Sequence, residues 1–438
     1  MYDLAVVNGR CWLGLQWVET NLYLQDGVIV RHSPALLEAK EVCDARGRMV
    51  IPGLIDSHVH LDMQAGRHRS RDDFASGTRA AAHGGITTVI DFLDPRPSAA
   101  ALEEQFRRRL AQAEGAVVDY ALHTSVAAPE DGVDAHVELS LRLGMPSVKV
   151  YTTYRPAGLY GPPSTLARLL ERSAGGDVLV MVHAELDELV DTASRPVACH
   201  GRNRPVAAEL AQVSLLAGLT DYYQGYCYVA HVSAGSTARL LAERFGPLLN
   251  RHIWMEGCPH YFLFDSEVYK GEDGCLFTMT PPLRSPEERQ GLLAQLARFW
   301  SISTDHCPFL AAEKRQALLG DIPMGVGGVE HSFSQMWALL GQDALPYFTE
   351  RPARLQGLWP RKGTLQEGAD GDVVILDDVP RTIGPQEHSR CDYSLYAGRT
   401  APVTAATVLS RGAYVVREGE DVPHQGRYLA RTLDLRRL

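Results

Sequence analysis

The sequence predicts an α/β protein, a (β/α)8 TIM barrel with a small β-sandwich domain formed by both termini. Three observations predict this architecture: apolar strands alternate with amphipathic helices in the middle of the chain, β-rich segments lie at both ends, and the chain has 438 residues. That length suits one large domain and a smaller one. The implied boundaries are 1–51 and 360–438 for the discontinuous β domain and 52–359 for the barrel.

The β domain is predicted from the residue pattern of the two ends of the chain. DLAVVNG, NLYLQDG and GVIVRHS combine β-branched residues with the turn dipeptides NG and DG. The same texture returns in GDVVILD and AATVLSRGAYVVREG. Two β-rich ends around a different middle region indicate one domain built from both.

The barrel is predicted from eight apolar strands in the middle region. In chain order they are MVIPGLIDSHVHL, ITTVIDF, VDYALHT, SVKVYTTY, VLVMVHAE, YCYVAHVS, IWMEGCPHY and WSISTDHCP. Helical segments such as PPSTLARLLERSAGG separate them, and several end at glycine, as helix C-termini often do. A doubly wound open sheet is the alternative, but it usually carries a glycine-rich phosphate loop after its first strand. Eight strand–helix units without that loop favour the barrel.

Composition and charge exclude several partners. The net charge of -10 argues against binding to nucleic acid or to an anionic membrane surface, because both need a basic surface on the protein. Eight cysteines without a CxxC spacing indicate reduced thiols in a cytoplasmic protein. The start, MYDLAVVNGR, does not have the pattern of a signal peptide. No apolar run approaches the roughly 20 residues that cross a bilayer.

Chemistry-bearing side chains recur at the predicted carboxyl ends of five strands. They are His58 and His60, Lys149, His183, His231 and Asp305. Taken alone, the His58–His60 pair favours two hydrogen-bonded core histidines. A barrel, however, gathers the carboxyl ends of its strands into one active site, so a shared role explains the whole set better than five separate ones. Imidazole and carboxylate together at such a site indicate a metal, in the first place zinc.

Lys149 is the unusual member, because a protonated ammonium has no lone pair and repels a cation. Burial near positive charge is expected to remove its proton. The neutral amine can then react with carbon dioxide to form a carbamate, whose two oxygens can bridge two metals. Four histidines, one carbamate and one aspartate suffice for a two-metal site that activates water and polarises a carbonyl.

The quoted motifs resemble a known family. GLIDSHVHLD, SVKVYTTY, MVHAE, YVAHVS and STDHCPF, in this order, are similar to the amidohydrolase superfamily, and most of all to its dihydropyrimidinase and D-hydantoinase branch. The resemblance extends over almost the whole chain, through TPPLRS, IPMGVGGVEH and GRYLAR. It implies a metal-dependent hydrolase that opens a cyclic amide, either a dihydropyrimidine or a hydantoin-type ring, to an N-carbamoyl amino acid.

The resemblance also implies a role for each residue. Two divalent ions, zinc or manganese, are expected on six ligands: His58, His60 and Asp305 for one ion, His183 and His231 for the other, and Lys149 as a bridging N6-carboxylysine. A metal-bridging hydroxide would attack the ring amide, with Asp305 as general base and then acid and Tyr154 stabilising the oxyanion. Tyr154, Thr280 and Met324 would bind the substrate. A homotetramer or dimer is expected, with the basic end GRYLARTLDLRRL reaching a neighbouring subunit.

The substrate loops depart from the pattern of that branch. Residues 64–67 read Gln-Ala-Gly-Arg in place of Pro-Phe-Gly-Gly, Met324 replaces an asparagine, and Glu330-His331-Ser332 replaces Glu-Asp-Arg. The ring itself therefore stays open, with allantoinase and dihydroorotase as alternatives. Asp62 stands where dihydroorotases have a carboxylate-binding arginine, which disfavours the latter. A non-catalytic scaffold related to dihydropyrimidinase is disfavoured because all six ligand positions and Tyr154 are filled.

Overall fold

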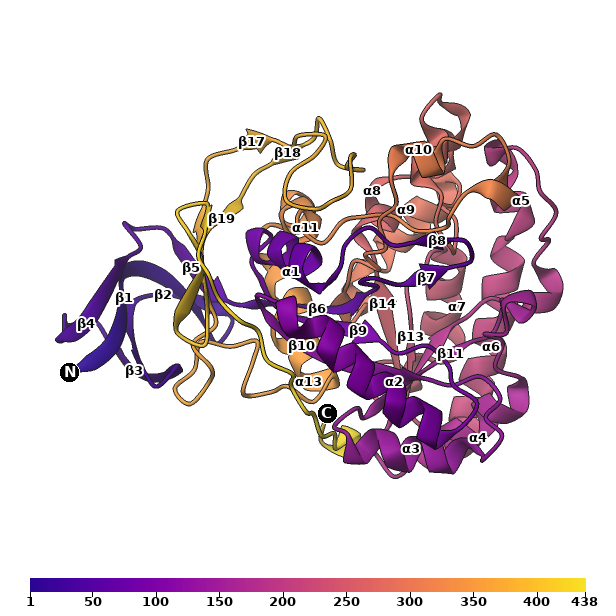
Figure 1. The fold of residues 1–438 in the computed structure, drawn as a ribbon, viewed down its shortest axis with the longest axis horizontal. Helices are drawn as coiled ribbons and strands as arrows, with labels where there is room; N and C mark the ends of the chain where they lie inside the picture. The colour runs from indigo at the N-terminus through magenta and orange to yellow at the C-terminus, as the bar shows by residue number, and fades with distance from the viewer.

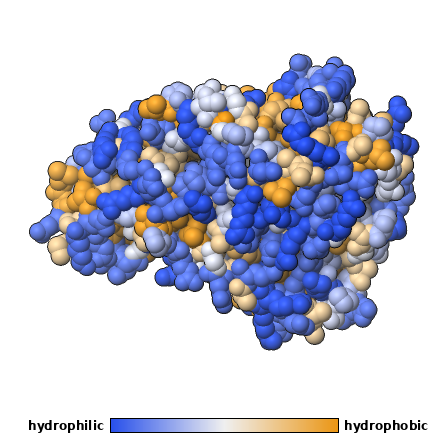
Figure 2. Space-filling model, turned by 45° about the horizontal axis from the view of Figure 1, so that its top comes forward, coloured by the Kyte–Doolittle hydropathy of each residue, from blue (hydrophilic) through white to orange (hydrophobic).

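The computed structural model describes residues 1–438 and consists of a barrel flanked by a β-sheet (Figure 1). In Figure 1 the indigo strands β1–β4 lie at the left, and the yellow strand β19 lies between them and the barrel, so both ends of the chain meet in the sheet. No helix is both long enough and apolar enough to span a membrane. The face in Figure 2 is mostly hydrophilic, with separate hydrophobic groups, one of them at the end formed by the N-terminal strands.

The barrel contains eight parallel strands that neighbour one another in sequence order. They are β6 (Leu54–Val59), β9 (Ile86–Phe92), β10 (Asp119–Ser125), β11 (Ser147–Tyr151), β12 (Leu179–His183), β13 (Cys227–Val229), β14 (Ile253–Gly257) and β15 (Ser301–Ile302). A parallel bridge between Val59 and His306 joins the last strand region to the first. The eight predicted strands and the barrel fold are thereby confirmed.

Helices follow the strands and cover the outside of the barrel (Figure 1). The longer ones are α1 (Phe74–His83), α2 (Ala99–Gln112), α3 (Val133–Arg142), α4 (Pro163–Ser173), α6 (Val206–Tyr223), α7 (Gly235–Arg244), α9 (Pro286–Ala294) and α11 (Ser332–Leu340). The shorter ones are α5 (His200–Asn203), α8 (Pro259–Leu263), α10 (Ala311–Lys314), α12 (Leu345–Phe348) and α13 (Glu350–Leu355). Strand and helix side chains together form a hydrophobic cluster of 74 buried residues, which fixes the strands that carry the site.

The strands of the flanking β domain form one hydrogen-bonded network of nine strands built from both ends of the chain. Its strands are β1 (Tyr2–Leu13), β2 (Gln16–Gln25), β3 (Val28–Ser33), β4 (Ala39–Asp44), β5 (Met49–Pro52), β16 (Val373–Asp377), β19 (Thr404–Ser410), β20 (Ala413–Arg417) and β21 (Glu420–Asp421). The long strand β1 pairs with β4 along its first half and with β5 farther on, which joins both halves into one sheet. A bridge from Val28 to Asp370 curls the sheet around 13 buried residues.

Two antiparallel pairs of short strands lie outside these sheets. One pairs β7 (Gln64–Ala65) with β8 (His68–Arg69), and the other pairs β17 (Arg381–Thr382) with β18 (Thr400–Ala401). The first hairpin contains the departing segment 64–67 and lies at the carboxyl side of β6.

Residues 427–431 of the C-terminal tail pack on the barrel of their own chain. Tyr120 N donates to Arg427 O, and Leu429 N donates to Tyr120 O, so the tail runs beside β10. Arg431 is 2% exposed, and its guanidinium donates to Leu122 O and Gln356 O. These buried contacts leave this part of the tail committed within the subunit.

Candidate active site

The structure brings the six predicted ligand residues together at the carboxyl ends of the barrel strands. His58 and His183 lie at the ends of β6 and β12, Lys149 lies in β11, and the others follow β6, β13 and β15 directly. Five of the side chains are buried, and the Asp305 side chain is 17% exposed. The six side chains therefore lie together and line one cavity.

Asp305 faces two histidines from the first strand. Its Oδ1 lies 3.3 Å from His58 Nε2 and 3.1 Å from His60 Nε2, and donor atoms of all three residues lie within 4.8 Å of one another. Burial alone would raise the pKa of Asp305, but the nearby His58 and His60 lower it well below its usual value. Asp305 is therefore ionised at neutral pH.

The far nitrogen of His58 is held by a carboxylate that sequence reasoning missed. Glu256, in β14, lies 2.8 Å from His58 Nδ1 and also accepts from Tyr228 Oη and from the His231 amide. Although burial raises the pKa of Glu256, His58 lowers it below its ordinary value. The ionised carboxylate places the imidazole hydrogen on Nδ1, so the lone pair of Nε2 points at Asp305.

The second pair of histidines has a similar arrangement. His183 Nε2 contacts Glu185 at 2.7 Å, and Arg204 forms an ion pair with the same carboxylate. This leaves the lone pair of His183 Nδ1 facing His231 Nε2 at 3.1 Å. Glu185 lies in the predicted strand VLVMVHAE and Glu256 in IWMEGCPHY, and neither is among the predicted site residues. Both glutamates lie at or just after the carboxyl end of a barrel strand, as the predicted ligand residues do.

These buried atoms form a donor set for cations. His58 Nε2 and Lys149 Nζ are buried without a hydrogen-bond partner, and so is the second nitrogen of His231, Nδ1. A buried polar atom without a partner costs on the order of 1–3 kcal/mol. Divalent ions between the lone pairs would remove this cost at His58 and relieve the lone-pair contact with Asp305. Imidazole and carboxylate donors of this kind suit zinc.

Lys149 lies deepest in the site. Its Nζ is 5.2 Å from the centre of the Phe92 ring and 5.3 Å from that of Tyr151. Burial lowers the pKa of Lys149 to about 8, so a substantial fraction of the amine is neutral near physiological pH. The neutral amine is the form that adds carbon dioxide.

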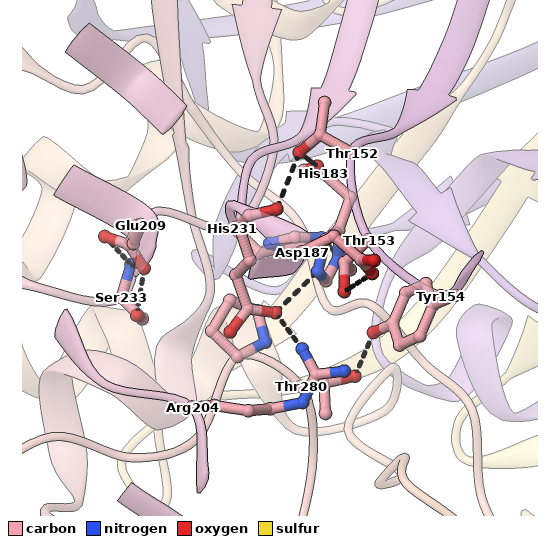
Figure 3. A network of polar contacts seen from close by, with 12 residues as sticks. Thr152, Thr153, Tyr154, His183, Asp187, Arg204, Glu209, His231, Ser233 and Thr280 are labelled. Atoms are coloured by element: carbon pink, nitrogen blue, oxygen red, sulfur yellow. Dashed lines mark hydrogen bonds and ion pairs between the residues drawn. The ribbon is translucent and has the colours of Figure 1, made fainter. Parts of the chain in front are cut away.

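Tyr154 faces the cavity from the loop after β11. Its Oη lies 2.5 Å from Thr280 Oγ1, and its ring centre is 5.1 Å from that of His183 (Figure 3). The Arg204 guanidinium lies over the Tyr154 ring at 4.9 Å. Burial raises the pKa of Tyr154 to about 12, so its hydroxyl keeps its proton and can donate a hydrogen bond at neutral pH.

Three of the predicted residues have left-handed backbone conformations. The φ angles are 68° for Tyr154, 38° for His231 and 50° for Asp305. Such conformations are rare for residues other than glycine and cluster at functional sites, where surrounding contacts maintain them. Here Glu256 binds the His231 amide, and Glu209 accepts from Ser233 two residues later (Figure 3).

A cavity of about 890 Å³ opens above this cluster. It is lined by all six predicted ligand residues, by Tyr154, Thr280 and Met324, and by the hairpin segment 64–68. Lys314 supports one wall, because its buried Nζ donates to Pro323 O and Gly325 O on either side of Met324. The volume is sufficient for a small ring with an exocyclic substituent.

Two further residues near the site, Cys307 and Asp62, do not have the roles that their positions in the sequence would suggest. Burial raises the pKa of Cys307 far above its usual value, which leaves it without a nucleophilic thiolate. Asp62 does not line the large cavity, because its carboxylate pairs with Arg69 at 2.6 Å. Arg67 lines that cavity instead, so the expected repulsion of a substrate carboxylate by Asp62 is not supported by its position.

Comparison with known proteins extends the likeness over the whole chain. Residues 49–208 match the amidohydrolase family. The chain is 32% identical over 413 residues to a protein named D-phenylhydantoinase from Escherichia coli O1:K1, with 88% of each chain covered. A D-hydantoinase structure from a Bacillus sp. AR9 aligns with a TM-score of 0.92 at 29% identity, covering 98% of this chain and 99% of that one. A dihydropyrimidinase from Brevibacillus agri NCHU1002 gives a TM-score of 0.90 at 29% identity with the same coverage.

Proposed function

The chain belongs to the hydantoinase and dihydropyrimidinase family of amidohydrolases and hydrolyses cyclic amides, and from this premise we propose how its residues do so. His58, His60 and Asp305 would hold one divalent ion, His183 and His231 would hold a second, and Lys149, carboxylated by carbon dioxide, would be a ligand of both. The observation that carries this proposal is the set of imidazole lone pairs that face one another and Asp305 in a buried site. Zinc is the proposed metal, and manganese is the alternative to test.

Bound ions of this kind polarise a carbonyl and lower the pKa of water. The remaining chemistry is proposed for side chains of the chain. The ionised Asp305 takes the proton of the attacking water and delivers it to the ring nitrogen as the C–N bond breaks. Water thus adds across the amide bond, its hydroxyl to the carbonyl carbon and its other hydrogen to nitrogen, and the product is an N-carbamoyl amino acid.

Glu256 is proposed to orient His58 toward the metal. In the Glu256→Gln variant the amide has no negative charge to fix the His58 hydrogen on Nδ1, so we expect divalent-ion affinity or turnover to fall about 10- to 100-fold. Metal titration and initial rates check this expectation. Glu243→Gln, at an exposed position on α7, is the control. Equal metal affinity and rate in the two variants would remove Glu256 from this role.

Tyr154 is proposed to donate a hydrogen bond to the oxyanion that develops on the attacked carbonyl, with Thr280 as its partner in the free site. Loss of one such donor lowers kcat by about 10²–10³, so Tyr154→Phe is expected to lose roughly a hundredfold while its metal content stays unchanged. Tyr160→Phe, in the same loop, is the control. A Tyr154→Phe enzyme with the wild-type kcat would exclude this role.

The ring is proposed to be a dihydropyrimidine or a 5-substituted hydantoin, held along its imide edge by the backbone near Thr280 and Met324. The test is a hydrolysis panel with zinc- and manganese-loaded protein, containing dihydrouracil, dihydrothymine, 5-substituted hydantoins, allantoin and dihydroorotate. Hydrolysis of the first three classes supports the proposal. Activity on dihydroorotate alone would overturn it and assign Arg67 at the cavity mouth to the substrate carboxylate.

We further propose that the chain forms a homotetramer or dimer in the cytoplasm. The location is supported by eight cysteines that are all free, seven of them buried, as expected in a reducing compartment. Light scattering at micromolar concentration is expected to give the mass of a tetramer or dimer. A monomer under these conditions would refute the proposed assembly.

A further inference from the structure

A second group of imidazole and carboxylate side chains lies outside the active site. Glu330 and His331 directly precede α11, and Glu387 comes from the segment between β17 and β18. One donor atom from each of the three lies within 4.8 Å of the others. None of the three lines the active-site cavity, so the group is separate from the strand-end cluster.

His331 is buried in this group, and its polar neighbour is the Glu387 carboxylate. It is 6% exposed, and its side chain makes no hydrogen bond within the chain. Its Nε2 points toward Glu387 Oε2 at 4.0 Å, beyond hydrogen-bond range.

The two carboxylates are only partly neutralised. Arg381 binds Glu387 through two hydrogen bonds of 2.6 Å. Glu330 meets His388, whose Nδ1 lies 2.7 Å away and whose amide donates at 3.1 Å. A carboxylate has about four lone-pair sites, so both can accept these contacts and still bind a cation.

The surroundings leave room for an ion. A cavity of about 30 Å³ is lined by Glu330, His331 and Glu387 together, which exceeds the roughly 10–15 Å³ that one water requires. The wider charge balance also favours a cation: Arg79 pairs with Asp421, which contacts His83, and His83 stacks on His388 at 3.4 Å. Arginine side chains contact Glu387 and Asp421 directly, whereas the direct side-chain partner of Glu330 is the His388 imidazole.

We propose that Glu330, His331 and Glu387 form an additional metal site that takes Zn²⁺, separate from the catalytic ions. Imidazole nitrogen and carboxylate oxygen are both zinc donors, and water can complete the tetrahedron. The ion joins the start of α11 to the segment between β17 and β18. Its role is structural, because the three residues do not reach the catalytic cavity.

The test is zinc content per chain in the dialysed full-length protein, measured for the wild type, His331→Gln and Glu387→Gln. We expect each variant to bind one zinc ion fewer than the wild type and to melt at a lower temperature in zinc. His252→Gln is the matched control, because His252 Nδ1 contacts Gly225 O far from both sites. Equal zinc content in the wild type and both variants would overturn the site.

The wild type provides a second measurement in case a variant does not fold. Titration of metal-free wild-type protein with Co²⁺ is expected to show one binding step more than the two of the strand-end site, with its own visible absorption, and the Lys149→Ala protein is expected to keep that step. If the catalytic centre binds no metal, every protein contains less zinc per chain. The wild type is still expected to bind one zinc ion more than His331→Gln. Failure of this inference is thus distinguishable from failure of the proposed catalytic centre. Absence of the additional step in wild-type protein would also contradict the site.

Discussion

Replacement of Lys149 by alanine is expected to reduce ring hydrolysis to background and to lower the metal content of the strand-end site. Lys149 Nζ is buried without a partner, and alanine cannot form the carbamate that the proposal uses to bridge the ions. The substitution is therefore expected to weaken the binding of both ions. Metal content and initial rates on the most active ring of the panel measure it.

A short carboxylic acid added to the Lys149→Ala protein tests the chemical reason. Acetate or propionate can enter the space left by the side chain and supply the two oxygens of the missing carbamate, so partial recovery of rate and metal content is expected. Lys270→Ala, at an exposed position, is the control and should behave as the wild type. Full activity of Lys149→Ala without added acid would rule out the carbamate bridge.

Replacement of Asp305 by asparagine is expected to have the second-largest effect. The amide keeps the shape of the side chain, but it cannot take a proton from water and return it to the ring nitrogen. General acid–base catalysis contributes about 10²–10⁴ in rate, so a loss in this range is expected even in protein saturated with metal. Asp305 also faces His58 and His60, so weaker metal binding is expected as well.

Rates at saturating metal separate the two contributions of Asp305. Metal titration reports the ligand role, and kcat at the plateau reports the proton-transfer role. Asp321→Asn, at the exposed mouth of the same cavity, is the control for a changed charge without contact to the cluster. A plateau kcat within about tenfold of the wild type would exclude Asp305 as the proton carrier.

Much of this architecture could be predicted because strand ends in a barrel are brought together by topology alone. The positions of His183 and His231 on neighbouring strands were enough to place them side by side. The same rule reaches Glu256, which ends β14, but its role became evident only when its oxygen was seen beside His58 Nδ1. Sequence order gives the strand on which a donor lies, whereas the nitrogen it contacts depends on rotamers and packing.

Other features depended on contacts between distant segments. The β domain forms a single curled sheet because β1 carries both β4 and β5, a choice of pairing that strand patterns do not specify. Asp62 pairs with Arg69 and leaves the cavity to Arg67, since a hairpin turns the chain between them. Glu387 lies beside His331 although the two residues are far apart in the sequence, and no local sequence pattern predicts this contact.

The most direct test of the account is reconstitution of metal-free protein with zinc, in buffer depleted of carbon dioxide or supplied with bicarbonate, with ring hydrolysis and bound zinc measured on the same samples. The account predicts that activity returns with bound zinc only when bicarbonate is present, because Lys149 must be carboxylated before the strand-end site can fill. Full activity of the metal-free protein, or equal recovery with and without bicarbonate, would contradict it.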